Sequence, residues 1–232
     1  MLKKRYKKNM NCFSKEELEV LHTKRIAVVG CGGLGGYVIQ ALSRFGIKSL
    51  TIIDKDYFDI SNLNRQVFSS EENIGRAKVN VISSELKKIN SSLKVISYQC
   101  MLDEKNVEHV LCEVDIIIDC VDNIEARKIM ASFAKEKKIP LIHGAIAGYY
   151  GQISTILPED KTMEILYPKN QEIETIEKDL GNPSFTPMCI ASIQVSECLK
   201  CLLGYKDILH NKIMHIDLLR NDFEVIEIKT PK

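Results

Sequence analysis

The chain has 232 residues, of which 45% are apolar and 27% are charged, and its formal net charge at pH 7 is +1. The length allows one good-sized α/β domain, or one domain with a modest appendage, and the composition is ordinary for a soluble globular protein. The small net charge gives no reason to expect a nucleic acid or a membrane as partner. No apolar run approaches the ~20 residues that cross a bilayer. Eight scattered cysteines without a pairing pattern suit a reducing compartment, so we expect a cytoplasmic protein.

The N-terminal segment is basic, with five cations among its first eight residues. On charge alone it is predicted to be a solvated, mobile tail. Ser14 and Glu17 then have the spacing of a capping box, which predicts a short helix up to about His22. We therefore divide the chain into an N-terminal arm with this helix, residues 1–24, and one main domain, residues 25–232.

The next segment predicts a strand, a tight turn and a helix. Arg25–Val29 is rich in β-branched side chains, and residues 37–45 have apolar side chains at helical spacing. Between them lie the glycines of a G-x-G-x-x-G pattern, which lets a phosphate approach the backbone at a helix N-terminus. The glycines are Gly30, Gly32, Gly33 and Gly35. The next predicted strand, 49–53, ends in Asp54, where a ribose-binding acid is expected.

Strands and helices continue to alternate along the main domain. Helices are expected over about 75–89, 103–112 and 124–137, and strands over 94–98, 114–118 and 139–142. This alternation predicts an α/β fold with a doubly wound, Rossmann-like, mostly parallel sheet. After Gly144 the pattern predicts, in order, an antiparallel strand over 149–157, a polar crossover loop over about 158–187, a helix over 188–203, and a closing antiparallel hairpin of 212–217 and 223–228.

The polar segment Lys55–Asn73 indicates which nucleotide the glycine turn serves. Arg65, within this segment, and Lys78, just beyond it, offer a forked donor and a mobile charge to phosphate oxygens. Asp122 follows a strand that is predicted to be buried, at the sheet edge where ligands bind, and a carboxylate there can hold Mg²⁺ on a triphosphate. Separately, the two cations could be surface residues and Asp122 could cap the next helix. Together they favour ATP over NAD.

Several motifs together resemble the ThiF/MoeB/HesA family, the prokaryotic relatives of ubiquitin-activating enzymes. They are G-C-G-G-L-G, D-x-D, S-N-L-N-R-Q, G-x-A-K, D-C-V-D-N and G-A-I-A-G-Y-Y-G-Q, and the similarity extends from about Arg5 to the closing hairpin. The resemblance implies an ATP- and Mg²⁺-dependent adenylyltransferase that activates the C-terminal glycine carboxylate of a small ubiquitin-like sulfur carrier ending in Gly-Gly. Residues 25–232 would then be a single ATP-binding adenylation domain.

The matched motif positions imply a set of site residues. By resemblance, Gly33 contacts a phosphate, Asp54 contacts the ribose, and Asp122 holds the Mg²⁺ ion. The implied nucleotide-binding residues are Gly30, Gly32, Gly33, Gly35, Asp54, Asp56, Asn62, Arg65, Gln66, Lys78, Asp122 and Asn123. The implied catalytic residues are Arg65, Lys78, Asp122 and Lys8. Because the attacking carboxylate is already ionised at neutral pH, the reaction needs cations around the phosphates and no general base.

Two features depart from the family pattern. Family members begin R-Y-x-R, and the second Arg reaches the partner's ATP site; here the segment reads Arg5-Tyr6-Lys7-Lys8, so the resemblance implies a homodimer in which Lys8 supplies the charge. The paired C-x-x-C motifs of many members are missing, and Cys198 and Cys201 stand alone, so no structural zinc is expected. The usual loop cysteine is also missing, and with Cys189 the nearest thiol, adenylation is expected without a covalent cysteine intermediate.

Three classes of function are open on this reasoning. The first is an adenylyltransferase acting on a ubiquitin-like carrier, or on another carboxylate in a modified peptide or in tRNA maturation. The second is an NAD-binding oxidoreductase, in which Arg65, Lys78 and Asp122 would be incidental. The third is a catalytically weak binder of a small partner protein.

Overall fold

The computed structural model describes residues 4–168 and 180–228. The strands are β1 (Arg25–Val29), β2 (Ser49–Ile53), β3 (Lys94–Tyr98), β4 (Ile116–Asp119), β5 (Leu141–Ala147), β6 (Tyr150–Ile156), β7 (Lys212–Asp217) and β8 (Asp222–Glu227). The α-helices are α1 (Lys15–Leu21), α2 (Gly33–Leu42), α3 (Lys78–Ile89), α4 (Val107–Leu111), α5 (Ile124–Lys137), α6 (Thr162–Leu166) and α8 (Phe185–Leu202). Short 3-10 helices are η1 (Lys4–Asn9), η2 (Ile60–Asn62) and η3 (Glu71–Asn73). Within the described ranges no helix has the length and apolar character that crossing a bilayer requires.

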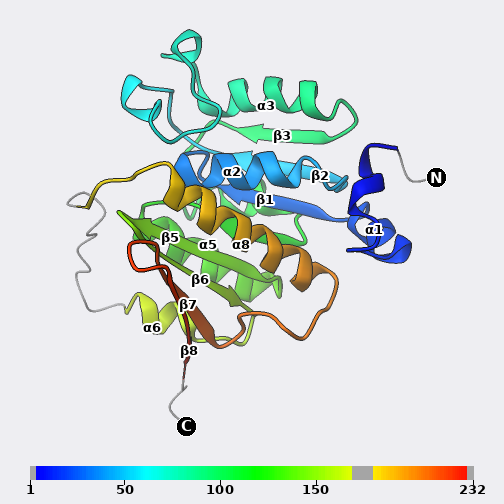
Figure 1. Ribbon diagram of the computed structural model, residues 1–232, viewed down its shortest axis with the longest axis vertical. Helices are drawn as coiled ribbons and strands as arrows, with labels where there is room; N and C mark the ends of the chain where they lie inside the picture. The colour runs from blue at the N-terminus through cyan, green and yellow to red at the C-terminus, as the bar shows by residue number, and fades with distance from the viewer. Residues whose placement is uncertain (1–3, 169–179, 229–232) are drawn as a thin grey trace.

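The strands form one eight-stranded sheet in the order β3-β2-β1-β4-β5-β6-β7-β8 (Figure 1). Strands β1 to β5 pair in parallel, whereas β6, β7 and β8 each join in antiparallel fashion. The predicted α/β, mostly parallel sheet with antiparallel C-terminal strands is confirmed. The carboxyl ends of β1, β2 and β4 meet at one edge, which is where a doubly wound fold places its ligand.

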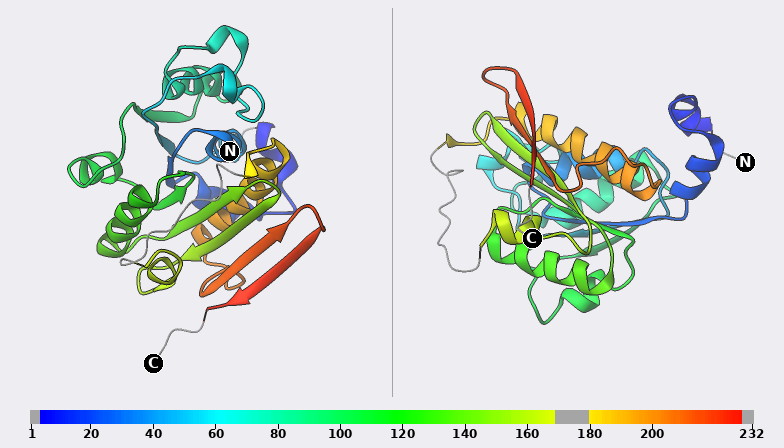
Figure 2. Two further views of the ribbon diagram at one scale, coloured as in Figure 1. Left: turned by 90° about the vertical axis from the view of Figure 1, so that its left-hand side faces the viewer. Right: turned by 90° about the horizontal axis from the view of Figure 1, so that it is seen from below.

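Helices cover both faces of the sheet (Figure 2), and buried apolar side chains form a core on each face. Because successive strand residues point to opposite faces, Ile26 and Val28 of β1 enter one core while Ala27 and Val29 enter the other. The first core is shared with α1, α2, α3 and α8, and the second with α4, α5 and α6. Burial on both faces explains why the inner strands read as nearly continuous apolar runs.

Most expected elements occur at their expected positions, and the differences have local causes. The helix expected from 75 begins at Lys78, since Gly75 has a φ of +79° and does not continue a helix. The helix expected over 188–203 begins earlier, at Phe185, with Pro187 in the first turn, where its missing N–H is tolerated. The expected crossover loop contains α6, and its residues 169–179 lie outside the described residues.

The basic N-terminal segment is anchored from Lys4 onward, which corrects the prediction of a mobile tail. The side chain of Tyr6 is 3% exposed, and its hydroxyl accepts a 3.0 Å hydrogen bond from Asn90 Nδ2. Arg5 Nη1 donates to Asn90 Oδ1 over 2.6 Å. A Cβ at Gly46 would lie 2.6 Å from the Tyr6 ring, so the aromatic ring occupies space that only glycine leaves open. One buried aromatic side chain therefore outweighs the charge pattern, although Lys4, Lys7 and Lys8 remain exposed.

Gly46→Ala is expected to destabilise the protein by about 1–3 kcal/mol more than Gly204→Ala. Both glycines have left-handed backbone, with φ of +75° and +74°, so both variants bear the same conformational cost. Only at Gly46 would the new Cβ collide with the Tyr6 ring, because nothing lies within 4 Å of the corresponding position at Gly204. Urea unfolding of the two variants measures the difference. Equal losses would contradict the seating of Tyr6 against Gly46.

Candidate functional site

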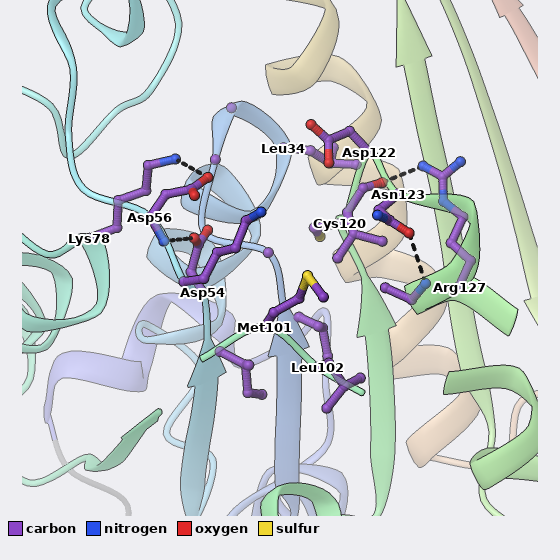
Figure 3. A pocket seen from close by; sticks show the side chains of 18 of the residues that line it. Leu34, Asp54, Asp56, Lys78, Met101, Leu102, Cys120, Asp122, Asn123 and Arg127 are labelled. Atoms are coloured by element: carbon purple, nitrogen blue, oxygen red, sulfur yellow. Dashed lines mark hydrogen bonds and ion pairs between the residues drawn. The ribbon is translucent and has the colours of Figure 1, made fainter. Parts of the chain in front are cut away.

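A cavity of about 460 Å³ opens at the carboxyl ends of β1, β2 and β4 (Figure 3). Its walls come from the glycine turn, the polar segment after β2, the loops after β3 and β4, and the middle of β5. The predicted site residues that line it are Gly30, Gly32, Gly33, Asp54, Asp56, Asn62, Arg65, Gln66, Lys78, Asp122 and Asn123. The fold thus brings together predicted residues that are separated by up to 93 positions in the sequence, from Gly30 to Asn123. Gly35 and Lys8 are not part of this lining.

The glycine turn places the start of α2 against the cavity. Gly30 has a φ of +90°, and a Cβ there would lie 2.5 Å from the carbonyl oxygen of Cys120. Helix α2 begins at Gly33 with no side-chain cap, so its first N–H groups have no partner inside the helix and face the cavity mouth. Gly35 is outside the cavity lining, and its cofactor contact stays a prediction: a Cβ there would lie 1.8 Å from the oxygen of Gly30. Its role in the structure is close packing of helix on turn.

Asp54, which directly follows β2, forms a hydrogen bond with the backbone of the same turn. Its Oδ2 accepts a 2.7 Å hydrogen bond from the backbone N–H of Cys31, and its Oδ1 accepts one of 2.8 Å from the N–H of Asp56. A carboxylate has about four lone-pair sites, so these two bonds leave Asp54 able to accept from a ligand hydroxyl as well. The carboxylate is therefore oriented before any ligand arrives.

Lys78 lies in the cavity wall with its side chain almost fully buried. It is 5% exposed, and its Nζ is 3.4 Å from Oδ2 of Asp56, whose side chain is half exposed (Figure 3). A buried ammonium needs such a partner. The pair holds the Lys78 charge at the first turn of α3, facing the same space as the start of α2.

Arg65 lies across the glycine turn. Its aliphatic stem packs so closely over Gly33 that a Cβ there would be 3.4 Å from Arg65 Cγ. Its Nη1 donates to the carbonyl oxygen of Ser61 and to Asn64 Oδ1, each over 2.9 Å. Both bonds use one nitrogen of a group with five donors, so the guanidinium is oriented while it keeps donors available within the described structure.

Asn62 and Gln66 are buried beneath Arg65. Asn62 Oδ1 accepts from the N–H of Asp59 over 3.1 Å and thereby closes the capping box of η2, so its amide shapes the polar segment. Gln66 is 6% exposed, and its Oε1 accepts no hydrogen bond within the described residues. A buried acceptor without a donor is costly. At the cavity wall such an acceptor suits a donor that a ligand brings.

The sequence left two roles open for Asp122, which were capping of the next helix and binding of Mg²⁺, and in the structure the capping role falls to Asn123. Asn123 caps α5, because its Oδ1 accepts from the N–H of Ala126 over 3.1 Å. Asp122 is thereby released from capping, and its exposed carboxylate faces the cavity from the side opposite Lys78 (Figure 3). One carboxylate fits a Mg²⁺ ion whose other ligands are water and phosphate oxygens. Among residues 4–168 and 180–228 no three His, Cys, Asp or Glu side chains gather into a protein-only metal site.

Behind Asp122 lies a buried polar cluster that the sequence analysis missed. It consists of Asp119 and Arg127, with Oδ2 to Nε at 3.2 Å, and of His143, whose Nδ1 is 2.7 Å from the same oxygen. Tyr167 completes it by accepting a 2.9 Å hydrogen bond from Arg127 Nη1. Only Asp119 carried a signal, as a carboxylate at the end of an apolar strand. We call these four residues the Arg127 cluster.

Two of the cysteines, Cys100 and Cys120, line the cavity, but burial raises the pKa of both thiols. Cys31, Cys120 and Cys198 are buried, and burial raises the pKa of each thiol well above its usual value. Burial also raises the pKa of Cys201 to about 11. Cys189, in the first turns of α8, has a pKa raised by burial and is not among the cavity residues. These thiols are poor nucleophiles, because the thiolate is the reactive form.

The sequence matches a known family along almost its whole length. The model of the ThiF family matches residues 6–232. The chain is 30% identical over 212 residues to the SAMP-activating enzyme E1 of Haloferax volcanii, covering 90% of this chain and 78% of that protein. It is 29% identical over 215 residues to the molybdopterin-synthase adenylyltransferase of Escherichia coli, covering 90% and 85%.

Solved structures share the fold at lower sequence identity. Escherichia coli MccB, crystallised with MccA-N7isoASN, matches with a TM-score of 0.84 and 21% identity, covering 100% of this chain and 73% of that chain. The Escherichia coli tRNA N6-threonylcarbamoyladenosine dehydratase TcdA, crystallised with ATP, matches with a TM-score of 0.73 and 21% identity, covering 86% and 94%. At these identities the likeness is one of fold.

Replacing His143 by Gln is expected to flatten the decline of stability in mild acid. Burial lowers the pKa of His143, even though Asp119 opposes the shift and Arg127 adds to it. As pH falls below the unfolded value of about 6.5, the unfolded chain gains a proton that the folded chain resists. Stability is therefore present above that pH and is lost below it.

Urea unfolding at several pH values between 7.5 and 5 measures this effect. These values bracket the ordinary histidine pKa of about 6.5. His215→Gln is the matched control, because His215 is exposed on β7 and its loss should leave the wild-type pH slope intact. A wild-type slope in His143→Gln would contradict the expected role of His143.

Proposed function

The chain belongs to the ThiF family and is an adenylyltransferase, and we propose that it uses ATP and Mg²⁺ to activate the C-terminal glycine carboxylate of a small ubiquitin-like sulfur-carrier protein. One observation carries the proposal: Arg65, Lys78 and Asp122 line one cavity together with the start of α2, and Lys78 and Asp122 face it from opposite sides (Figure 3). This arrangement suits a nucleotide triphosphate whose oxygens meet cations and whose metal ion meets a carboxylate.

The reaction needs electrostatic help more than proton transfer. The carboxylate of the carrier attacks the α-phosphorus, the bond to the bridging oxygen breaks, and pyrophosphate leaves with that electron pair. The products are an acyl adenylate and pyrophosphate. Negative charge accumulates on the leaving group and on the α-phosphate oxygens, so preorganised cations and N–H dipoles lower the barrier. A Mg²⁺ ion held by Asp122 would neutralise part of the phosphate charge.

Each side chain has a task that its geometry supports. The N–H groups at the start of α2 and the free face of Arg65 receive phosphate oxygens. Lys78 faces the same phosphates once they compete with Asp56 for its ammonium group. Asp54 accepts from the ribose hydroxyls while it keeps its bonds to the backbone. The raised pKa of Cys189 supports adenylation without a covalent cysteine intermediate.

The N-terminal arm supports a homodimer. Tyr6 seats the arm against Gly46 and Asn90, near the ends of α2 and α3 that lie far from the cavity (Figure 1). Lys8 is exposed there and is not among the residues that line the cavity of its own chain. We propose that the arm presents Lys8 to the cavity of a second copy, where its charge adds to that of Arg65.

Arg65→Ala is expected to lower carrier-dependent exchange of labelled pyrophosphate into ATP by about 100-fold or more, because it removes a cation from the developing charge. Arg76→Ala is the matched control: Arg76 lies in the same part of the chain but is exposed and outside the cavity lining, so its exchange rate should stay at the wild-type level. The assay uses Mg²⁺ and carrier proteins that end in Gly-Gly and are encoded by genes next to the gene of this protein. Exchange that survives in Arg65→Ala, or that is missing in the wild type with every carrier, would sink the proposal.

A mixture of Lys8→Ala and Arg65→Ala chains should regain exchange that neither variant has alone. In a mixed dimer the Lys8→Ala chain supplies an intact cavity, and its partner supplies the missing lysine. Lys7→Ala serves as control, since Lys7 is an exposed neighbour and its loss should preserve exchange in the unmixed protein. Native mass spectrometry reports whether mixed dimers form. Mixed dimers that remain inactive would rule out the action of Lys8 across the interface.

A further inference from the structure

We propose that Arg127 is a positioning residue that holds the loop carrying Asp122 in the orientation needed for the nucleotide-bound Mg²⁺, with Tyr167 and His143 holding Arg127 in turn. The inference rests on the proposed function, and it concerns a side chain that the reaction scheme above does not use. Arg127 belongs to the first turn of α5, its guanidinium lies beside the loop after β4, and it is among the residues that line the cavity (Figure 3).

Arg127 joins four separate segments of the fold. Its Nη2 donates to the carbonyl oxygen of Val121 and, at 3.5 Å, to that of Gly144 on β5. Its Nε pairs with the Asp119 carboxylate at the end of β4, and its Nη1 donates to the Tyr167 hydroxyl just after α6. The guanidinium carbon also lies 5.4 Å from the centre of the Tyr167 ring, within cation–π range.

These bonds restrain the backbone on both sides of Asp122. Val121 is held at both polar groups: its N–H donates to Asp119 Oδ1 over 3.1 Å, and its carbonyl oxygen accepts from Arg127. Asn123 is held by its capping bond to the N–H of Ala126. Asp122 therefore projects from a backbone whose neighbours are both tied down, while its own side chain stays exposed to the cavity.

The hydrogen bonds of the Arg127 cluster close into a ring with one consistent direction. Arg127 donates to the Tyr167 hydroxyl, which lies 3.3 Å from His143 Nε2 and can donate to it. With Nε2 as acceptor, His143 carries its proton on Nδ1 and donates to Asp119 over 2.7 Å. Asp119 in turn forms an ion pair with Arg127, which closes the ring. The tautomer follows from this network, since every donor meets an acceptor only in that arrangement.

Burial makes the ring difficult to rearrange. Asp119 and His143 are fully buried, and Arg127 is 6% exposed. Moving the guanidinium would leave the Asp119 carboxylate without its partner in a region that water does not reach, which is strongly unfavourable. The ring thus provides the kind of fixed outer support that orients a metal-binding carboxylate, and loss of such support costs about 10–100-fold in metal affinity or activity.

Two variants test the role of Arg127. Arg127→Lys keeps a positive charge beside Asp119, but a single ammonium cannot reach Val121, Gly144 and Tyr167 together. Tyr167→Phe leaves Arg127 in place and removes only the hydroxyl that accepts from it, so it covers the case in which Arg127→Lys folds poorly. Arg44→Lys is the matched control, because Arg44 is exposed at the end of α2, away from the cavity.

Isothermal titration calorimetry of ATP with and without Mg²⁺ gives the decisive readout. In Arg127→Lys, the gain in ATP affinity that Mg²⁺ confers is expected to fall by about tenfold or more. ATP affinity without Mg²⁺ should remain as in the wild type, because the cations around the phosphates are untouched. Tyr167→Phe should show a smaller loss in the same direction, and Arg44→Lys none.

The outcomes separate this proposal from the proposed function. Equal weakening with and without Mg²⁺ would mean that Arg127 contacts the nucleotide directly, and a lower melting temperature with unchanged binding would mean a purely structural role; either result overturns the proposal. A selective loss of the Mg²⁺ effect in a protein that exchanges no pyrophosphate would contradict the proposed function and still support the positioning role.

Discussion

The turn between β1 and α2 can form only because no side chain stands at Gly30 or Gly35. A Cβ at Gly35 would lie 1.8 Å from the oxygen of Gly30, and a Cβ at Gly30 would lie 2.5 Å from the oxygen of Cys120. This contact brings the first turn of α2 to the carboxyl ends of β1 and β4, with its unpaired N–H groups toward the cavity. The rest of the site is placed relative to that turn, beginning with Asp54, which accepts from the N–H of Cys31.

Cations and carboxylates both line the cavity around the turn, and Asp56 forms an ion pair with Lys78 there. Arg65 and Lys78 approach from the polar segment after β2 and from the start of α3, whereas Asp122 approaches from the loop after β4. The restraints on these groups differ in kind. Lys78 is held by an ion pair with Asp56, Arg65 by hydrogen bonds through one nitrogen, and Asp122 through its backbone neighbours. An anionic ligand with a bound cation is complementary to a cavity that presents both cations and carboxylates.

A second polar layer lies behind this first one and is almost completely buried. Asp119, Arg127 and His143 expose 6% of their surface or less, so their charges and hydrogen bonds are satisfied by one another. Low exposure strengthens each of these interactions and raises the cost of breaking one. The layer joins β4, α5, β5 and the end of α6, and it therefore links the loop of Asp122 to the start of the crossover segment.

Local chemistry determined much of what the sequence by itself predicted. The capping box at Ser14 and Glu17, the bounds of β1, β2 and β3, and the glycine turn were all predicted, because each depends on residues within a few positions of one another. The presence of Asp54, Arg65, Lys78 and Asp122 around one cavity was predictable as well, since the strands of a doubly wound sheet deliver their carboxyl ends to one edge.

Other features were decided only by the tertiary structure. Tyr6 packs over Gly46 and accepts a hydrogen bond from Asn90, which is 84 residues away. A charge count does not detect such contacts, so it indicated a mobile tail where the arm is anchored. Asn123 caps α5, so Asp122 does not. Which of these two neighbouring residues caps the helix depends on the backbone geometry and not on the residue types. Tyr167 meets Arg127 across 40 positions of sequence. No periodicity or motif encodes such contacts, because they arise when the packed sheet brings distant polar side chains into a space without water.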